Sequence, residues 1–193
     1  MLSVCSSHSW GNNAPVIVVL GDSLSAGFGL QQGEGWVSLL QQKLQQQAYP
    51  HRVINASISG DTTGSALARL ANALQHRPNI LIVELGGNDG LRGLPLKTMQ
   101  SNLRQIIEQG QQIGAKVLLL GMQIPPNYGP LFAQRFTQTY ETVARDTGAV
   151  LLPFFLAGME ADTRFYQADQ IHPNAKGQPL MLQNVWEKLQ PML

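Results

Sequence analysis

The chain has 193 residues, of which 44% are hydrophobic and 13% are charged, and its formal net charge at pH 7 is +1. This length is enough for one globular domain with a buried core. Lysines and arginines are scattered singly, so we expect no nucleic-acid partner, which would need them clustered. The apolar runs fall far short of the roughly 20 residues that span a bilayer, so we expect no stable membrane insertion.

Residues 1–13 are mostly small and polar, and we expect them to be a loose lead-in to a single domain over residues 14–193. The chain's one cysteine, Cys5, lies in this segment, so no internal disulfide can form. We interpret Cys5 as an incidental free thiol, because Val4 before it fits a lipidation site poorly. The apolar part of the segment is too short for the core of a signal peptide.

Alternating sequence patterns predict the elements of the domain in chain order. Apolar runs at 15–20, 51–56, 79–85, 115–121 and, more weakly, 148–153 predict β-strands. Segments with a 3.6-residue period predict helices at 35–48, 62–75, 101–114, 132–148 and 178–193. Runs that are apolar on both faces are typical of central parallel strands covered by helices. The alternation therefore predicts a doubly wound α/β sheet.

Small and polar residues follow the first four predicted strands. They lie at 21–23, 57–63, 86–90 and 122–129. In an open parallel sheet the carboxyl ends of the strands share one edge, which is where ligands bind. Any one of these four segments, which we call the strand tips, could be an ordinary turn, and Asp61 or Thr62 could simply cap the next helix. Three such tips together with a suitable histidine indicate catalysis.

One histidine stands out by its neighbours. His172 lies in a loop after the last predicted strand, with Asp169 three residues earlier. This offset can place the carboxylate beside the imidazole Nδ1–H, which leaves Nε2 free to take a proton from Ser23. Taken alone, Asp169 could instead cap a turn while His172 merely packs there. No role is predicted for the other histidines, which are His8, His51 and His76. We expect His51 and His76 to lie at the surface.

Other site types find little support in the sequence. A metal site needs several ligands at suitable spacing, and the only close pair is Asp169 and His172, so no metal site is predicted. The glycines after Ser23 are not followed by Gly-Lys-Ser/Thr, which argues against a phosphate loop. The Gly-x-Ser-x-Gly elbow of the α/β-hydrolases is also absent.

Four sequence blocks together resemble a known family. Gly-Asp-Ser-Leu comes early, a glycine follows the second strand, Gly-x-Asn-Asp follows the third, and Asp-x-x-His comes late. This order resembles that of the SGNH (GDSL) hydrolases and covers the whole predicted domain. Longer strings, such as "LGDSLSAG" and "ELGGNDGLRG", are similar to the bacterial group of multifunctional thioesterases, lysophospholipases and arylesterases.

The resemblance implies roles for individual residues and an architecture. Ser23 would be the nucleophile, with Asp169 and His172 completing a catalytic triad. The backbone N–H groups of Ser23 and Gly60 and the amide of Asn88 would form the oxyanion hole, whose donors stabilise the tetrahedral intermediate. The fold implied is a flavodoxin-like three-layer α/β/α sandwich with five parallel strands and no cofactor. The resemblance also implies a periplasmic or secreted location.

The substrate is predicted from the fourth tip. Its apolar residues could line an acyl groove, or the loop could simply pack over the sheet edge; they are Ile124, Pro126, Tyr128 and Phe132. We predict a monomeric serine esterase and thioesterase acting on small-molecule acyl esters or thioesters. Asp22 and Asp89 are expected to support the site or its turns.

Two other hypotheses fit the same scaffold. A carbohydrate O-acetyl esterase would use exposed aromatic residues near the tips, for which Tyr128 and Trp36 are the candidates. A binding module without catalysis would use Ser23, Gly60 and Asn88 to hold an anion, and the Asp169–His172 pair would then be coincidental.

Overall fold

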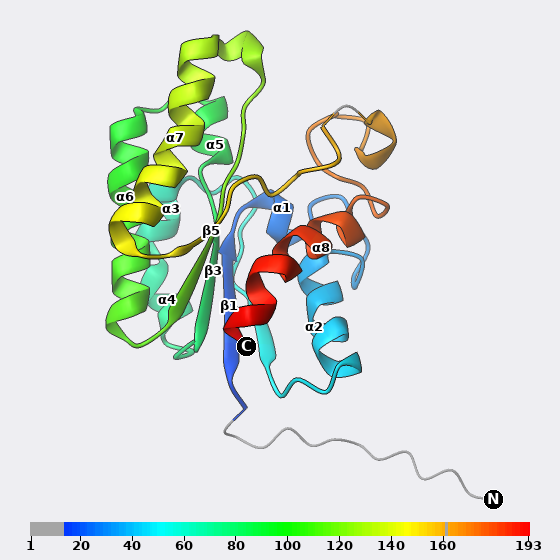
Figure 1. Ribbon diagram of the computed structural model, residues 1–193. Coiled ribbons are helices and arrows are strands. Elements are labelled where there is room, and N and C mark those ends of the chain that lie inside the picture. Colours follow the sequence, from blue (N-terminus) through cyan, green and yellow to red (C-terminus); the bar gives the residue numbers. More distant parts are fainter. Residues whose placement is uncertain (1–13, 161) are drawn as a thin grey trace, which may run out of the picture.

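The computed structural model describes residues 14–160 and 162–193, and its central feature is one parallel sheet (Figure 1). The strands are β1 (Val16–Gly21), β2 (Arg52–Asn55), β3 (Ile80–Glu84), β4 (Lys116–Leu120) and β5 (Val150–Leu152). Their order across the sheet is β2-β1-β3-β4-β5, and all pairs are parallel. This order is the flavodoxin-like one, so the predicted fold is confirmed. The lead-in predicted for residues 1–13, with Cys5 and His8, lies outside the described residues.

Helices cover both faces of the sheet (Figure 1). One face carries α3 (Thr63–Ala68), α4 (Leu70–Leu74), α5 (Gly87–Leu91), α6 (Leu96–Gln112) and α7 (Pro130–Thr147), and the other carries α2 (Trp36–Gln46) and α8 (Gln178–Leu189). The short α1 (Ser23–Ala26) follows β1 directly. Three 3-10 turns complete the elements: η1 (Pro126–Tyr128), η2 (Thr163–Phe165) and η3 (Gln190–Met192).

The core lies on both sides of the sheet. Every residue of β1 and β3 is buried, as expected for strands covered on both faces. The helices contribute apolar stripes, such as Trp36, Leu40 and Leu44 of α2 and Leu103 of α6, all fully buried. Burying one such aliphatic side chain contributes about 1.5–3 kcal/mol, so these stripes fix the helices on the sheet. No helix in the described ranges is long and apolar enough to cross a membrane.

The helix predicted over residues 62–75 is interrupted at Arg69. The backbone there leaves the helical region (φ −108°, ψ 7°), which divides the segment into α3 and α4. The Arg69 guanidinium pairs with Asp61 and donates to the backbone oxygens of Ala56 and Gly21, at the ends of β2 and β1. These tertiary contacts override the helical pattern. Thr62, and not Asp61, is the N-terminal cap of α3. The side chains of Thr62 and Ser65 each accept the backbone N–H of the other residue.

The expectation that His51 lies at the surface is wrong. Only 8% of this residue is exposed, and its ring centroid lies 6.4 Å from that of Tyr49. Tyr49 packs in turn against Trp186 of α8, and the His51 backbone oxygen accepts a hydrogen bond from Gln41 of α2, so the residue lies between the start of β2 and the helices on that face. His76, at the end of the α4 segment, is exposed as expected.

Candidate active site

The carboxyl end of β1 presents Ser23 at the edge of the sheet. Asp22 caps α1 by accepting the Leu24 N–H at 3.0 Å, so the chain turns into a helix immediately after the strand. Ser23 is therefore the first helical residue and is only half-buried. Among the described residues its backbone N–H has no acceptor, as is usual in the first turn of a helix.

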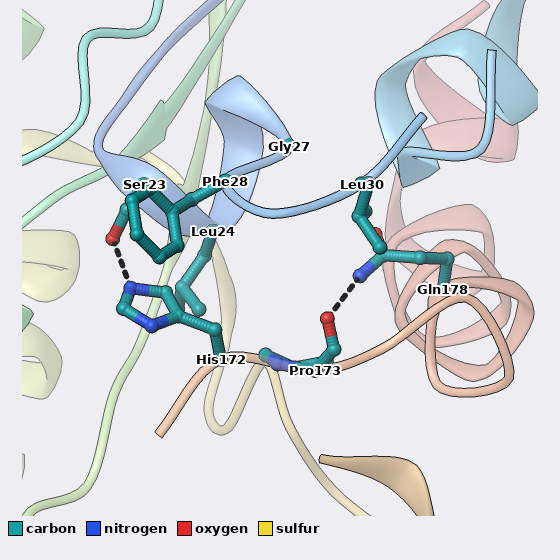
Figure 2. A pocket seen from close by; sticks show the side chains of 8 residues that line it. All are labelled: Ser23, Leu24, Gly27, Phe28, Leu30, His172, Pro173 and Gln178. Atoms are coloured by element: carbon teal, nitrogen blue, oxygen red, sulfur yellow. Dashed lines mark hydrogen bonds between the residues drawn. The ribbon is translucent and has the colours of Figure 1, made fainter. Parts of the chain in front are cut away.

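The loop between η2 and α8 brings an imidazole to that hydroxyl. His172 Nε2 lies 2.9 Å from Ser23 Oγ, and His172 Nδ1 lies 2.7 Å from Asp169 Oδ2 (Figure 2 shows the first contact). The loop is braced internally, because Gln167 N–H donates to the His172 backbone oxygen at 2.8 Å. The three residues predicted to act together are thus in one hydrogen-bonded chain, although 149 positions separate Ser23 from His172.

Asp169 is held in its ionised form by the same loop. Its Oδ1 accepts the backbone N–H groups of Ile171 and His172 at 2.9 and 3.0 Å. These bonds, together with the contact to the His172 ring, lower the pKa of Asp169 to about 2. An ionised Asp169 favours the imidazole tautomer with hydrogen on Nδ1, and Nε2 then faces Ser23 as an acceptor.

Gly60 and Asn88 lie at the two neighbouring strand tips. Gly60 has a left-handed backbone (φ +85°), and its N–H has no acceptor among the described residues. Asn88 lies in α5, and its Nδ2 donates to Asp22 Oδ2 at 3.0 Å and to the Asp61 backbone oxygen at 2.9 Å. Both amide hydrogens of Asn88 therefore already have acceptors within the site.

Several residues at the site were not predicted from the sequence. Arg92 donates to the Gly60 backbone oxygen at 2.9 Å and so supports the loop that carries the Gly60 N–H. Phe28 lies over the His172 ring, with the two centroids 4.6 Å apart. Glu84 is fully buried at the end of β3 and contacts Asp22. A lone acidic residue at the end of an apolar strand was a usable signal for Glu84, whereas Arg92 and Phe28 depend on tertiary contacts.

A shallow hollow of about 150 Å³ opens beside Ser23 and His172 (Figure 2). The other lining residues are Leu24, Gly27, Phe28, Leu30, Pro173 and Gln178. The hollow is open to solvent and encloses almost no space, so much of a long substrate would lie outside it.

The residues predicted to line an acyl groove lie elsewhere at the same edge. Ile124 is buried next to Gly90 in α5, Tyr128 in η1 is 42% exposed, and Phe132 packs partly against the core. None of these three lines the hollow beside His172. Pro126 begins η1. Within the described ranges, no group of three or more His, Cys, Asp or Glu residues is arranged to hold a metal ion.

Comparison with known proteins agrees with this arrangement. Residues 19–180 match the GDSL-like Lipase/Acylhydrolase family, and the chain belongs to that family. Esterase TesA of Pseudomonas aeruginosa is 48% identical over 181 residues, covering 93% of this chain and 90% of that protein. Thioesterase 1/protease 1/lysophospholipase L1 of Escherichia coli K12 is 40% identical over 181 residues, covering 93% and 86%.

A solved structure supports the same conclusion. The psychrotrophic esterase EstA from Pseudoalteromonas sp., inhibited by monoethylphosphonate, superposes with a TM-score of 0.87 at 44% identity, covering 91% of this chain and 97% of that one. The chain is therefore an enzyme, an SGNH-family serine hydrolase of the esterase and thioesterase type. These findings favour the esterase and thioesterase hypothesis over a carbohydrate O-acetyl esterase or a binding module.

Proposed function

We propose that the protein hydrolyses carboxylic esters and acyl thioesters through an acyl-enzyme on Ser23. The observation that carries this proposal is the hydrogen-bonded chain from Asp169 through His172 to Ser23, with contacts of 2.7 and 2.9 Å. A serine hydroxyl is a weak nucleophile until a neighbouring base takes its proton, and His172 Nε2 is within reach of that proton.

The reaction would follow two half-cycles. Ser23 Oγ attacks the substrate carbonyl carbon while its proton passes to His172 Nε2, which gives a tetrahedral intermediate. The intermediate collapses as the bond from carbon to the leaving oxygen or sulfur breaks, and the imidazolium returns the proton to the leaving alcohol or thiol. In the second half-cycle, His172 takes a proton from water as the water oxygen attacks the acyl carbon, which gives a second tetrahedral intermediate. The bond from that carbon to Ser23 Oγ then breaks, the imidazolium returns its proton to Ser23 Oγ, and the carboxylic acid leaves.

The negative charge of the intermediate needs donors at a fixed point. We assign the backbone N–H groups of Ser23 and Gly60 to this role, and their lack of acceptors among the described residues supports the assignment. Asn88 would join them by sharing one amide hydrogen that now points to Asp22 or Asp61. Losing one such donor typically costs about 10²–10³ in rate.

The two sides of the site would hold different parts of the substrate. His172 must reach the leaving group, so we place the leaving alcohol or thiol in the hollow beside Phe28 and Leu30. The acyl chain would then run on the opposite side, past Asn88, along the loop that begins at Ile124. The packing of Ile124 against Gly90, two residues after Asn88, supports this direction. Pro126, Tyr128 and Phe132 would extend the same surface.

We further propose that residues 14–193 act as one domain and that the protein is a monomer. All the groups assigned to the reaction lie on one chain, so no second copy is needed to complete the site. We also propose a periplasmic or secreted location, which the sequence resemblance to the SGNH hydrolases implies.

The decisive experiment compares Ser23→Ala with wild type on p-nitrophenyl esters and acyl-CoAs of graded chain length. We expect Ser23→Ala to abolish turnover of every substrate while its circular dichroism and melting temperature stay close to those of wild type. Ser101→Ala is the matched control, because Ser101 is exposed on α6, and it should keep full activity. Turnover by a folded Ser23→Ala variant would refute the proposal.

A further inference from the structure

A pair of buried carboxyl groups lies directly behind Ser23. Glu84 ends β3 and is fully buried, and Asp22, the residue before Ser23, is 2% exposed. The two strands meet here, because Gly21 of β1 pairs with Glu84 in the sheet. Because Gly21 has no side chain, the Glu84 carboxyl group has room beside it. A Cβ at position 21 would lie 2.8 Å from Glu84 Oε2.

The hydrogen bonds of Glu84 are uneven between its two oxygens. Oε2 accepts the Ser25 hydroxyl at 2.8 Å and the Asp22 N–H at 3.3 Å, whereas Oε1 has no N–H or hydroxyl donor among the described residues. The Asp22 and Glu84 carboxyl groups are close neighbours, and each shifts the pKa of the other. Asp22 itself is well supplied with donors, because its two oxygens accept the Leu24 N–H and the Asn88 amide.

No lysine or arginine of the described residues compensates two negative charges at this point. Within the described residues, no lysine or arginine makes an ion pair with Asp22 or Glu84, and the nearby Arg69 pairs with Asp61. Two other titratable groups interact with the pair: His172 acts on Asp22, and Tyr140 of α7 interacts with both carboxyl groups. Asp89 of α5 interacts with Tyr140 and not with the pair itself. Two carboxylates in contact without a cation do not both ionise, because their repulsion adds to the cost of burial.

We infer that Glu84 is a positioning residue, a neutral carboxylic acid that donates its proton to Asp22 and keeps Asp22 as the ionised acceptor for Asn88. The direction of the proton follows from where the donors lie and from burial. Each Asp22 oxygen accepts a hydrogen bond, whereas both donors to Glu84 reach Oε2 and leave Oε1 without one. Glu84 is also the more deeply buried group. Burial and the Asp22 charge raise the pKa of Glu84 well above its ordinary value. Burial raises the pKa of Asp22 only to about 6, because Leu24, Glu84 and Asn88 donate to it.

The consequence lies in the position of Asn88. The ionised Asp22 holds one amide hydrogen of Asn88 and the N-terminus of α1, so it ties a proposed oxyanion donor to the turn that presents Ser23. Glu84 touches neither the substrate nor the reacting atoms. It acts through Asp22, by keeping a single charge on the pair.

Infrared difference spectroscopy tests the protonation directly and needs no turnover. At pH 8 wild type should show the C=O stretch of a protonated carboxylic acid, and Glu84→Gln should lack it. Glu108→Gln, at an exposed position of α6, is the matched control and should leave the band unchanged. A wild type without the band, or a band that persists in Glu84→Gln, would overturn the inference.

The kinetic test of this inference rests on the proposed function. Failure of the proposed function can be distinguished from failure of the inference, because the infrared measurement does not depend on turnover. Glutamine can donate to Asp22 and accept from Ser25 as the neutral acid does, so Glu84→Gln should keep kcat within about threefold of wild type. Glu84→Leu can do neither, and we expect its kcat to fall by about tenfold or more, approaching the loss of one oxyanion donor, with a smaller change in KM. A folded Glu84→Gln variant that lost kcat as severely as Glu84→Leu would show that the negative charge is required, and the inference would fail.

Discussion

Asp169 and Asp162 are two carboxylates with similarly low pKa values, each about 2, but with different partners. The Asp162 value results mainly from hydrogen bonds with Arg164, and Asp169 is bonded to the backbone and the ring of His172. A low pKa therefore does not by itself identify a member of the active site. The contact from Asp169 to an imidazole that also reaches Ser23 makes the distinction.

Replacing each carboxylate by its amide separates the two roles. In Asp169→Asn the amide no longer stabilises the imidazolium or selects its tautomer, so we expect kcat to fall by about 10³–10⁴ with p-nitrophenyl butyrate. Asp162→Asn removes a similar charge from the same loop region and should leave kcat unchanged. Steady-state kinetics at pH 7.5 provide the measurement, and equal activity in the two variants would contradict the role of Asp169.

At the scale of elements, the short helix α5 sets the position of Asn88. It begins after Gly86, whose left-handed backbone (φ +108°) and close neighbours leave no room for a side chain. A Cβ there would meet the Tyr140 hydroxyl and Met99 Cε. Gly93, just after the same helix, also has a positive φ (+63°), but a Cβ added there would meet nothing within 4 Å.

This contrast predicts different outcomes for two similar substitutions. Gly86→Ala carries both backbone strain and overpacking, so we expect it to lower the free energy of unfolding by about 2–4 kcal/mol and to reduce kcat by displacing Asn88. Gly93→Ala carries the strain alone, and we expect a loss of about 1–2 kcal/mol with kcat unchanged. Denaturant unfolding together with ester hydrolysis measures both effects, and equal losses of stability would argue against the packing explanation.

Some elements could be predicted from the sequence and others could not. The five strands were predicted to within about two residues at each end. The central strands β1, β3 and β4 are buried and form apolar runs, and the edge strands β2 and β5 still contain short apolar stretches that can be recognised locally. The break at Arg69 and the burial of His51 were not predicted, since both depend on contacts with distant residues. The helices α1 and α5 were also missed, because elements of four or five residues contain less than two turns of periodic pattern.

The candidate site also contains residues that the sequence could indicate and contacts that it could not. Ser23, Gly60, Asn88, Asp169 and His172 lie in short motifs, so they could be identified in the sequence. The structure adds what the motifs do not contain, above all the pairing of Glu84 with Asp22 and the support of Gly60 by Arg92. Those contacts join strand tips that are 32 or more positions apart, and their geometry depends on the complete sheet.

For the whole molecule, His51 connects pH to stability at the end of the sheet opposite Ser23. Burial, with a smaller contribution from the charge of Lys116, lowers the pKa of His51 below its ordinary value of 6.5. As the pH falls below 6.5, the unfolded chain therefore binds a proton at His51 more readily than the folded chain does. The free energy of unfolding should fall as the pH drops through this range.

Substitution of His51 tests this dependence. His51→Phe removes the titration and the ring nitrogen that has no partner among the described residues, so its stability relative to wild type should increase as the pH falls from 7 to 5. His76→Phe, at an exposed position, should show no such trend. Urea unfolding across this pH range is the measurement, and parallel curves for wild type and His51→Phe would rule out the proposed cause.

The separation of Ser23 from His172 along the chain has a practical consequence. A cut in the loop before α7 would leave the proposed nucleophile and oxyanion donors on one fragment and the proposed base with its carboxylate on the other. Neither fragment would hold a complete set of reacting groups, and release of p-nitrophenol would report their reassembly. Fused to two interacting partners, the halves would thus form a split reporter whose colour appears only when those partners meet.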